Sequence, residues 1–182
     1  MLSGWPAGVT AVASSDLEPY VDGVPGRVEW VLLAYRMPRE PSTPRITVWR
    51  KLRRLGAAQV GDGLVALPAD ARTREQLEWV ADDVLAAAGE ATVWLARLGS
   101  AGQERALVER MAESVAGEYR RVVEEARSAL AEHPAARRRT LRRLRRAVHS
   151  IGQRDFFPPP ERDEARRAIE AVADQVAAEV AP

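Results

Sequence analysis

The order of short apolar runs and longer amphipathic segments between residues 29 and 97 limits the possible folds more than any other feature of the sequence. Four of these segments are short and rich in β-branched, aromatic and aliphatic residues, as buried strands are. Two longer segments repeat apolar residues at helical spacing. Their order is strand, helix, strand, strand, helix, strand. It predicts an α+β fold with the split βαβ, or ferredoxin-like, βαββαβ sheet.

Turn and capping residues set the expected bounds of these elements. The turn Gly61-Asp62-Gly63 between two apolar runs predicts a β-hairpin. Thr43 is the expected N-cap of the first helix, with Pro44 at its first position. Thr73 is the expected cap of the second helix, and Gly89 its expected C′ residue. The expected strands are 29–36, 57–60, 64–67 and 92–97, and the expected helices are 44–55 and 73–88.

Beyond Gly99 the sequence predicts only helices. The expected helices are, in order, 102–132, a basic helix from Pro134 to about Ile151, and 161–180, the last after a proline-rich loop over 154–160. We therefore expect a ferredoxin-like domain over 29–99 and a helical extension of about three helices over 100–182, packed on it. Residues 1–28 mix Gly, Pro, Ser and acids without a period, which predicts a flexible leader.

The same leader lacks the features of a targeting segment. It has no positively charged start and no continuous apolar core, and no apolar run in the chain approaches the ~20 residues of a membrane span. We expect a cytoplasmic protein with no membrane partner.

The composition disfavours most kinds of catalytic and metal site. The 182 residues include no cysteine, which excludes disulfides, thiolate zinc sites and cysteine nucleophiles. The two histidines, His133 and His149, are expected to be capping or surface residues, and the tryptophans to be core residues. The turn at 61–63 is too short to cradle a phosphate. We expect no metal, no cofactor and no enzymatic activity.

The basic helix is the main candidate for function. Between Pro134 and Arg154 there are eight arginines and no acid, while Leu141 and Leu144 mark the side that faces the core. Repulsion within such a run disfavours folding unless other charges neutralise it. One interpretation is a site for nucleic-acid phosphates. The candidate residues are Arg138, Arg139, Arg142, Arg143, Arg145 and Arg146. The other interpretation pairs these arginines with the preceding acidic helix, which holds Glu104, Glu109, Glu113, Glu118, Glu124 and Glu125.

A smaller basic cluster on the first helix consists of Arg50, Lys51 and Arg54. If this cluster lies on the same side as the basic helix, the two form one groove for nucleic acid; otherwise it is a solvated helix face. The sequence leaves both interpretations open.

Glu118 falls within the apolar stripe of the long helix, so we expect it to be partly buried. A buried carboxylate needs a partner, and Arg154 is one candidate, beside Arg36 and Arg97. The pair Glu118–Arg154 is therefore a candidate buried ion pair. Use of Glu118 as a catalytic acid or base is the alternative.

Several segments resemble the N-terminal domain of the chromate-resistance regulator ChrB. They include the string Trp30-Val31-Leu32-Leu33, then Pro38, Ser42, Arg45, Trp49-Arg50 and Leu52, then Leu55-Gly56-Ala57, Gly63 and Leu67-Pro68, and finally Arg154-Asp155-Phe156-Phe157-Pro158. The similarity extends over about residues 29–178.

This resemblance implies a DNA-associated transcriptional regulator of chromate-efflux genes, with DNA as partner and chromate or a similar oxyanion as a candidate effector. Longer members carry a further C-terminal domain associated with chromate sensing, and we expect the chain ending at Pro182 to lack it. The expected fold is also similar to that of small CRISPR-associated endoribonucleases, which hold a metal with an aspartate at the end of the first strand. Here that position reads Tyr35-Arg36-Met37, which argues against metal-dependent cleavage. We expect a homodimer; the alternatives are a non-catalytic structural or dimerisation module, or an enzyme built around Glu118.

Overall fold

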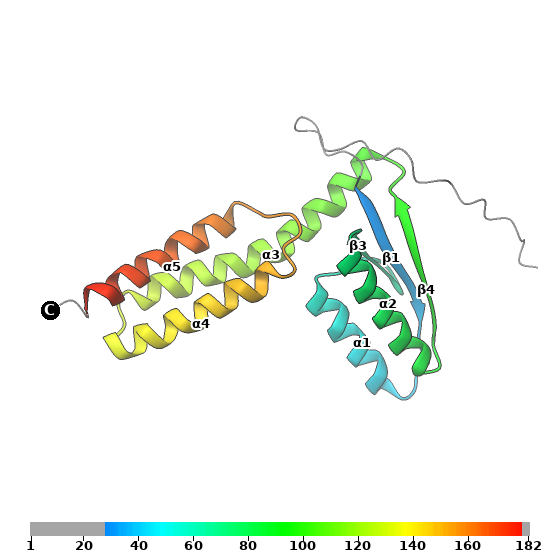
Figure 1. Cartoon of the computed structure of the whole chain (residues 1–182), viewed down its shortest axis with the longest axis horizontal. Coiled ribbons are helices and arrows are strands. Elements are labelled where there is room, and N and C mark those ends of the chain that lie inside the picture. Colours follow the sequence, from blue (N-terminus) through cyan, green and yellow to red (C-terminus); the bar gives the residue numbers. More distant parts are fainter. Residues whose placement is uncertain (1–27, 180–182) are drawn as a thin grey trace, which may run out of the picture.

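The computed structural model describes residues 28–179 as a four-stranded antiparallel sheet with helices on it, continued by a bundle of long helices (Figure 1). The elements are, in chain order, β1 (Glu29–Arg36), α1 (Ser42–Leu55), β2 (Ala58–Gly61), β3 (Leu64–Pro68), α2 (Ala71–Ala86), β4 (Glu90–Arg97), α3 (Ala101–Ala129), α4 (Pro134–Gly152) and α5 (Glu161–Ala178). The predicted α+β class and the order of the first six elements are confirmed. The predicted leader, 1–28, lies outside the described residues except for Val28.

The sheet has the strand order β2-β3-β1-β4, with β1 paired to β3 on one side and to β4 on the other. Successive side chains of a strand point to opposite faces, so Val31 and Leu33 share one face and Trp30 lies on the other. The first face is covered by α1 and α2 (Figure 1), and both Val31 and Leu33 are fully buried there. Trp30 packs instead against Phe157, with 5.9 Å between the ring centres.

The first helix begins earlier than predicted. Helix α1 starts at Ser42, its N-cap is Pro41, and no side chain caps it, so the prediction of Thr43 as N-cap is wrong. Pro44 therefore lies at the third position of the helix. This position tolerates proline because the first four backbone N–H groups of a helix have no partner within it.

The prediction of Thr73 as the cap of the second helix is also wrong. Asp70 is the N-cap of α2 and Thr73 is the third residue of the helix. The Thr73 N–H donates to Asp70 Oδ1 (2.6 Å) and the Asp70 N–H donates to Thr73 Oγ1 (2.9 Å), which satisfies two backbone donors reciprocally. The cap thus lies three residues before the predicted one, at an aspartate, which is also a preferred N-cap residue.

At the other end of α2, Ala88 and not Gly89 has the left-handed conformation, with φ of 56°. Gly89 is needed for a different reason. A Cβ atom there would lie 2.5 Å from the Arg36 carbonyl oxygen and 2.7 Å from Val84 Cγ1. Strand β4 then begins at Glu90, two residues before the predicted start.

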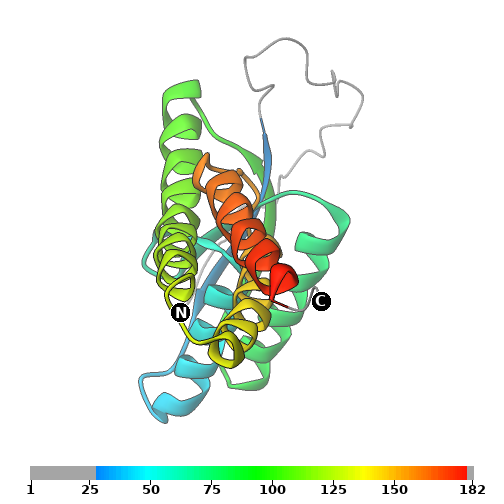
Figure 2. The same ribbon diagram turned by 90° about the vertical axis from the view of Figure 1, so that its left-hand side faces the viewer.

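Helices α3, α4 and α5 form the second part of the molecule (Figures 1 and 2). The 29-residue helix α3 contributes to both apolar cores. Its first turns, with Leu107 and Met111, pack with the sheet, and its later turns, from Val115 onward, pack with α4 and α5. Helix α3 ends at Ala129, three residues before the predicted end at 132.

Three tryptophans contradict the prediction that these residues belong to the core. Trp49, Trp79 and Trp94 are 51%, 60% and 49% exposed, whereas Trp30 is buried as predicted. Trp5 lies outside the described residues. Within 28–179, none of the helices combines the length and the apolar character that crossing a membrane requires.

Candidate nucleic-acid interface

Helix α4 is amphipathic in the way the sequence indicates. Pro134 is its first residue, and the His133 Nδ1 atom accepts from the Ala135 N–H (3.4 Å), which caps its start. Leu141 and Leu144 are buried against α3 and α5. The arginines on the opposite side are exposed, so the fold presents a cationic surface along this helix.

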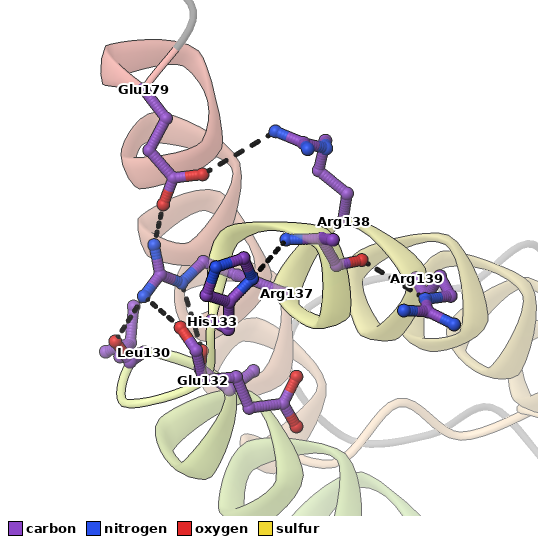
Figure 3. Close-up of polar contacts among 9 residues, drawn as sticks. Leu130, Glu132, His133, Arg137, Arg138, Arg139 and Glu179 are labelled. Carbon is purple, nitrogen blue, oxygen red and sulfur yellow. Dashed lines mark hydrogen bonds and ion pairs between the residues drawn. The ribbon is translucent and has the colours of Figure 1, made fainter.

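Arg137 is an exception, because its side chain is buried at the far end of the bundle (Figure 3). Its Nε donates to the Ala129 carbonyl (3.1 Å), and its Nη2 donates to the carbonyls of Leu130 (2.8 Å) and Glu132 (2.6 Å). Its Nη1 pairs with Glu179. Arg137 therefore satisfies carbonyls at the C-terminal end of α3 and has a structural role. Its position beside Leu141 on the helical wheel was the available signal.

Two further arginines of α4 have acidic partners. Arg143 pairs with Glu125 of α3, and Arg138 lies 3.8 Å from the second oxygen of Glu179. Among the α3 glutamates, Glu125 is the one that forms an ion pair with an α4 arginine in residues 28–179. The buried Glu104 instead accepts from the Val28 N–H (2.9 Å). The predicted pairing with the acidic helix is thus found for one arginine of α4, Arg143.

The remaining arginines of α4 have no acidic partner within the described part of the chain. Arg139, Arg142 and Arg146 follow one line along the outer side of the helix, and we name these three residues the arginine ridge. Arg139 donates to the Ala135 carbonyl of its own helix (3.3 Å). Arg145 is also exposed but faces α5, where it borders a hollow with Arg166 and Glu170.

The basic cluster of α1 divides in a similar way. Lys51 forms an ion pair with Asp83 of α2, whereas Arg50 and Arg54 are exposed. Arg54 borders a cleft between α1 and α3, and no residue of the arginine ridge lines this cleft.

The loop after α4 attaches to α3 through two neighbouring residues. Arg154 Nη2 lies 2.5 Å from Glu118 Oε2, and both side chains are largely buried. The Tyr119 hydroxyl donates to Asp155 Oδ2 (2.9 Å). Burial and this carboxylate together raise the pKa of Tyr119 to about 12. Arg154 thus holds the Glu118 carboxylate through its Oε2 atom, as the predicted ion pair requires.

Comparison with known proteins gives the family. Residues 45–134, from α1 to the first residue of α4, match the family described as "Protein ChrB, N-terminal". Residues 45–134 of this chain belong to the ChrB N-terminal family. Protein ChrB of Cupriavidus metallidurans is 33% identical to the chain over 135 residues, which is 71% of this chain and 40% of that ChrB protein. The chain thus spans less than half of this relative. No solved structure matches the chain.

The family match ends before the arginine ridge begins. Residues 45–134 include α1 from its fourth residue onward, the strands β2 to β4, and all of α2 and α3, but only the first residue of α4. The ridge is therefore argued from its geometry in this chain and not from the ChrB family match.

Proposed function

We propose that this chain is the DNA-binding part of a transcriptional regulator related to chromate resistance, and that the arginine ridge of α4 binds the phosphate backbone. The similarity to ChrB supports the link to chromate resistance. The element order and the strand order β2-β3-β1-β4 support the ferredoxin-like interpretation of the sheet. The observation that carries the DNA proposal is the line of exposed guanidinium groups on α4 that have no acidic partner among residues 28–179.

The spacing along the ridge suits a phosphate backbone. Arg139, Arg142 and Arg146 follow each other at about 4.5 and 6 Å along the helix axis, at 1.5 Å per residue. Like charges at these spacings repel each other, and a polyanion removes that repulsion while releasing its own counterions. Contacts of this kind position a protein on DNA without reading its sequence. We therefore expect the ridge to give affinity, with base recognition supplied by other residues.

The test is a comparison of duplex binding by two charge-matched variants. The ridge variant is Arg139→Gln/Arg142→Gln/Arg146→Gln. The control variant is Arg105→Gln/Arg127→Gln/Arg167→Gln, which removes three exposed arginines of α3 and α5. Binding to a fluorescent duplex is measured by anisotropy over a range of salt concentrations.

We expect the ridge variant to lose most of its affinity at low salt. Three phosphate contacts also account for a slope of about 2.7 in the plot of log affinity against log salt, which the ridge variant should lose. The control variant should keep both. Equal binding by the ridge variant and the wild type would exclude the ridge as the DNA site.

Chromate is a small dianion, and exposed guanidinium groups attract such an ion by charge. We propose a response to chromate or a similar oxyanion as the regulatory input of this function. Calorimetric titration with chromate and with sulfate distinguishes selective binding from general attraction. Equal weak heats for both ions would exclude a selective oxyanion effect in this chain.

A homodimerisation module is the second candidate function. Strand β4 is an edge of the sheet and exposes Trp94 and Leu95, which are 49% and 52% accessible. An exposed edge with large apolar side chains is a typical template for pairing with another chain. Light scattering with and without DNA tests this candidate. A monomer under both conditions would exclude it.

A further inference from the structure

The cleft between α1 and α3 is a concave surface lined by several arginines. It has a volume of about 590 Å³ and lies beside the start of β2. Its arginines are Arg53 and Arg54 from α1, Arg110 and Arg121 from α3, and Arg154 from the loop after α4. Glu118 is the acidic residue that lines it. Three segments distant in sequence thus bring guanidinium groups to one hollow.

The charges of this cleft are not balanced by the described residues. The Glu118 carboxylate is taken up by Arg154 at 2.5 Å. Arg53, Arg54, Arg110 and Arg121 form no ion pair within 28–179, and all four are exposed. Positive groups that converge on a hollow concentrate the potential there and attract an anion. The cleft is therefore suited to a ligand with more than one negative charge.

An aromatic side chain stands at the rim of the same cleft. Trp49 is 51% exposed, and the Arg53 guanidinium lies over its ring at 5.2 Å from the ring centre. Exposure of a tryptophan leaves a large apolar surface in contact with water. A flat aromatic ring with a guanidinium group beside it is a common platform for stacking a nucleobase.

We propose that this cleft binds a nucleoside phosphate, with the base on the Trp49–Arg53 platform and the phosphate at an α3 arginine of the cleft, Arg110 or Arg121. The volume supports this over a lone oxyanion, because sites for small organic ligands measure about 300–1,000 Å³. A free nucleotide and one nucleotide of a single strand present the same chemistry. The site is separate from the arginine ridge and does not depend on the ridge's function.

The test uses the full chain, with isothermal calorimetry against three probes. The probes are adenosine diphosphate, inorganic phosphate, and a fully single-stranded oligodeoxynucleotide. The cleft variant is Arg110→Gln/Arg121→Gln, and its control on the same helix is Arg105→Gln/Arg127→Gln. Trp49→Ala removes the platform, while Trp49→Phe retains an aromatic ring. Circular dichroism checks that each variant is folded.

We expect the cleft variant to bind adenosine diphosphate or the single strand at least about tenfold more weakly than the wild type, because charge-assisted hydrogen bonds are lost. Trp49→Ala should weaken binding about fivefold or more, and Trp49→Phe much less. The control and the ridge variant should bind adenosine diphosphate as the wild type does. Binding of the diphosphate identifies a free nucleotide as the ligand, and binding of the single strand alone identifies a strand.

Three results would overturn the proposal: no binding of either nucleotide probe, inorganic phosphate binding as tightly as the diphosphate, or affinities that do not respond to the cleft variant. The ridge experiment is separate, because it measures duplex binding with Arg110 and Arg121 intact. Failure of one proposal is therefore distinguishable from failure of the other.

Discussion

Tyr119 and Asp155 form a buried contact between a helix and a loop 36 positions apart in the sequence. The tyrosine ring is fully buried, and Asp155 Oδ1 has no hydrogen-bond partner in the described structure. The Asp155 carboxylate therefore relies on the Tyr119 hydroxyl, which donates a hydrogen bond to its other oxygen, Oδ2. The raised pKa of Tyr119, about 12 against an ordinary value of 10, means that the folded state favours the protonated phenol.

The change Tyr119→Phe tests this contact. We expect it to lower the free energy of unfolding by about 1–3 kcal/mol at pH 7, because the Asp155 carboxylate loses its donor. In the wild type, the contribution from the raised pKa is fully present below pH 10 and is lost as the pH rises to about 12. The variant should therefore lose less stability over that range. Urea denaturation at pH 7, 9 and 11 measures the loss of stability at pH 7 and its change with pH. A variant as stable as the wild type at pH 7 would contradict the role of this hydrogen bond.

Ala88 and Gly89 show why a residue's role is harder to predict than its element. The sequence rule that places glycine in the left-handed position after a helix gives Gly89. The structure places Ala88 there and uses Gly89 where a Cβ would meet the Arg36 carbonyl oxygen. That carbonyl belongs to β1, more than fifty positions earlier. The close approach exists only once the sheet has formed, so local sequence rules cannot reveal it.

At the scale of elements, the sequence could predict that α4 is a helix, but it could not predict which acidic residues pair with its arginines. The break at Pro134 and the spacing of Leu141 and Leu144 are local signals, and the structure agrees with them. The acidic partner of Arg143 is on α3, and the acidic partner of Arg137 and Arg138 is Glu179, directly after the end of α5. These ion pairs depend on how three helices pack together, and the periodicity of a single helix does not predict that packing.

The structural role of Arg137 can be tested by measuring the free energy of unfolding of variants. It donates to three carbonyls at the end of α3 and pairs with Glu179, so Arg137→Ala should lower the free energy of unfolding by about 3–5 kcal/mol. Arg137→Lys should also be destabilising, because one ammonium group cannot reach all of these oxygens. The matched control Arg139→Gln, two positions away on the exposed side, should change stability by about 0.5 kcal/mol or less. Thermal and urea unfolding measure the difference, and equal stability of the Arg137 and Arg139 variants would contradict it.

At the scale of the whole molecule, the sheet part and the bundle have separate apolar cores joined by α3 and by the loop after α4. In that loop Arg154 pairs with Glu118, and Phe157 packs on Trp30. Gly56 lies against the same loop, since a Cβ there would be 2.7 Å from Arg154 Cβ. The sequence predicts a ferredoxin-like domain over 29–99 and a helical extension over 100–182. It did not reveal that Trp30 faces this loop, because strand alternation alone does not say what covers each face.

This arrangement predicts that Phe157 couples the unfolding of the two parts. The described tryptophans all belong to residues 30–94, so tryptophan fluorescence reports mainly on the sheet part, whereas helical circular dichroism reports mainly on α3 to α5. In the wild type we expect both signals to change at the same urea concentration, because α3 runs through both cores. In Phe157→Ala the loop loses its contact with Trp30, and the fluorescence transition should move to lower urea than the dichroism transition. The control Leu130→Ala, at the exposed far end of the bundle, should keep the two together. Coincident transitions in Phe157→Ala would mean that α3 alone couples the two cores.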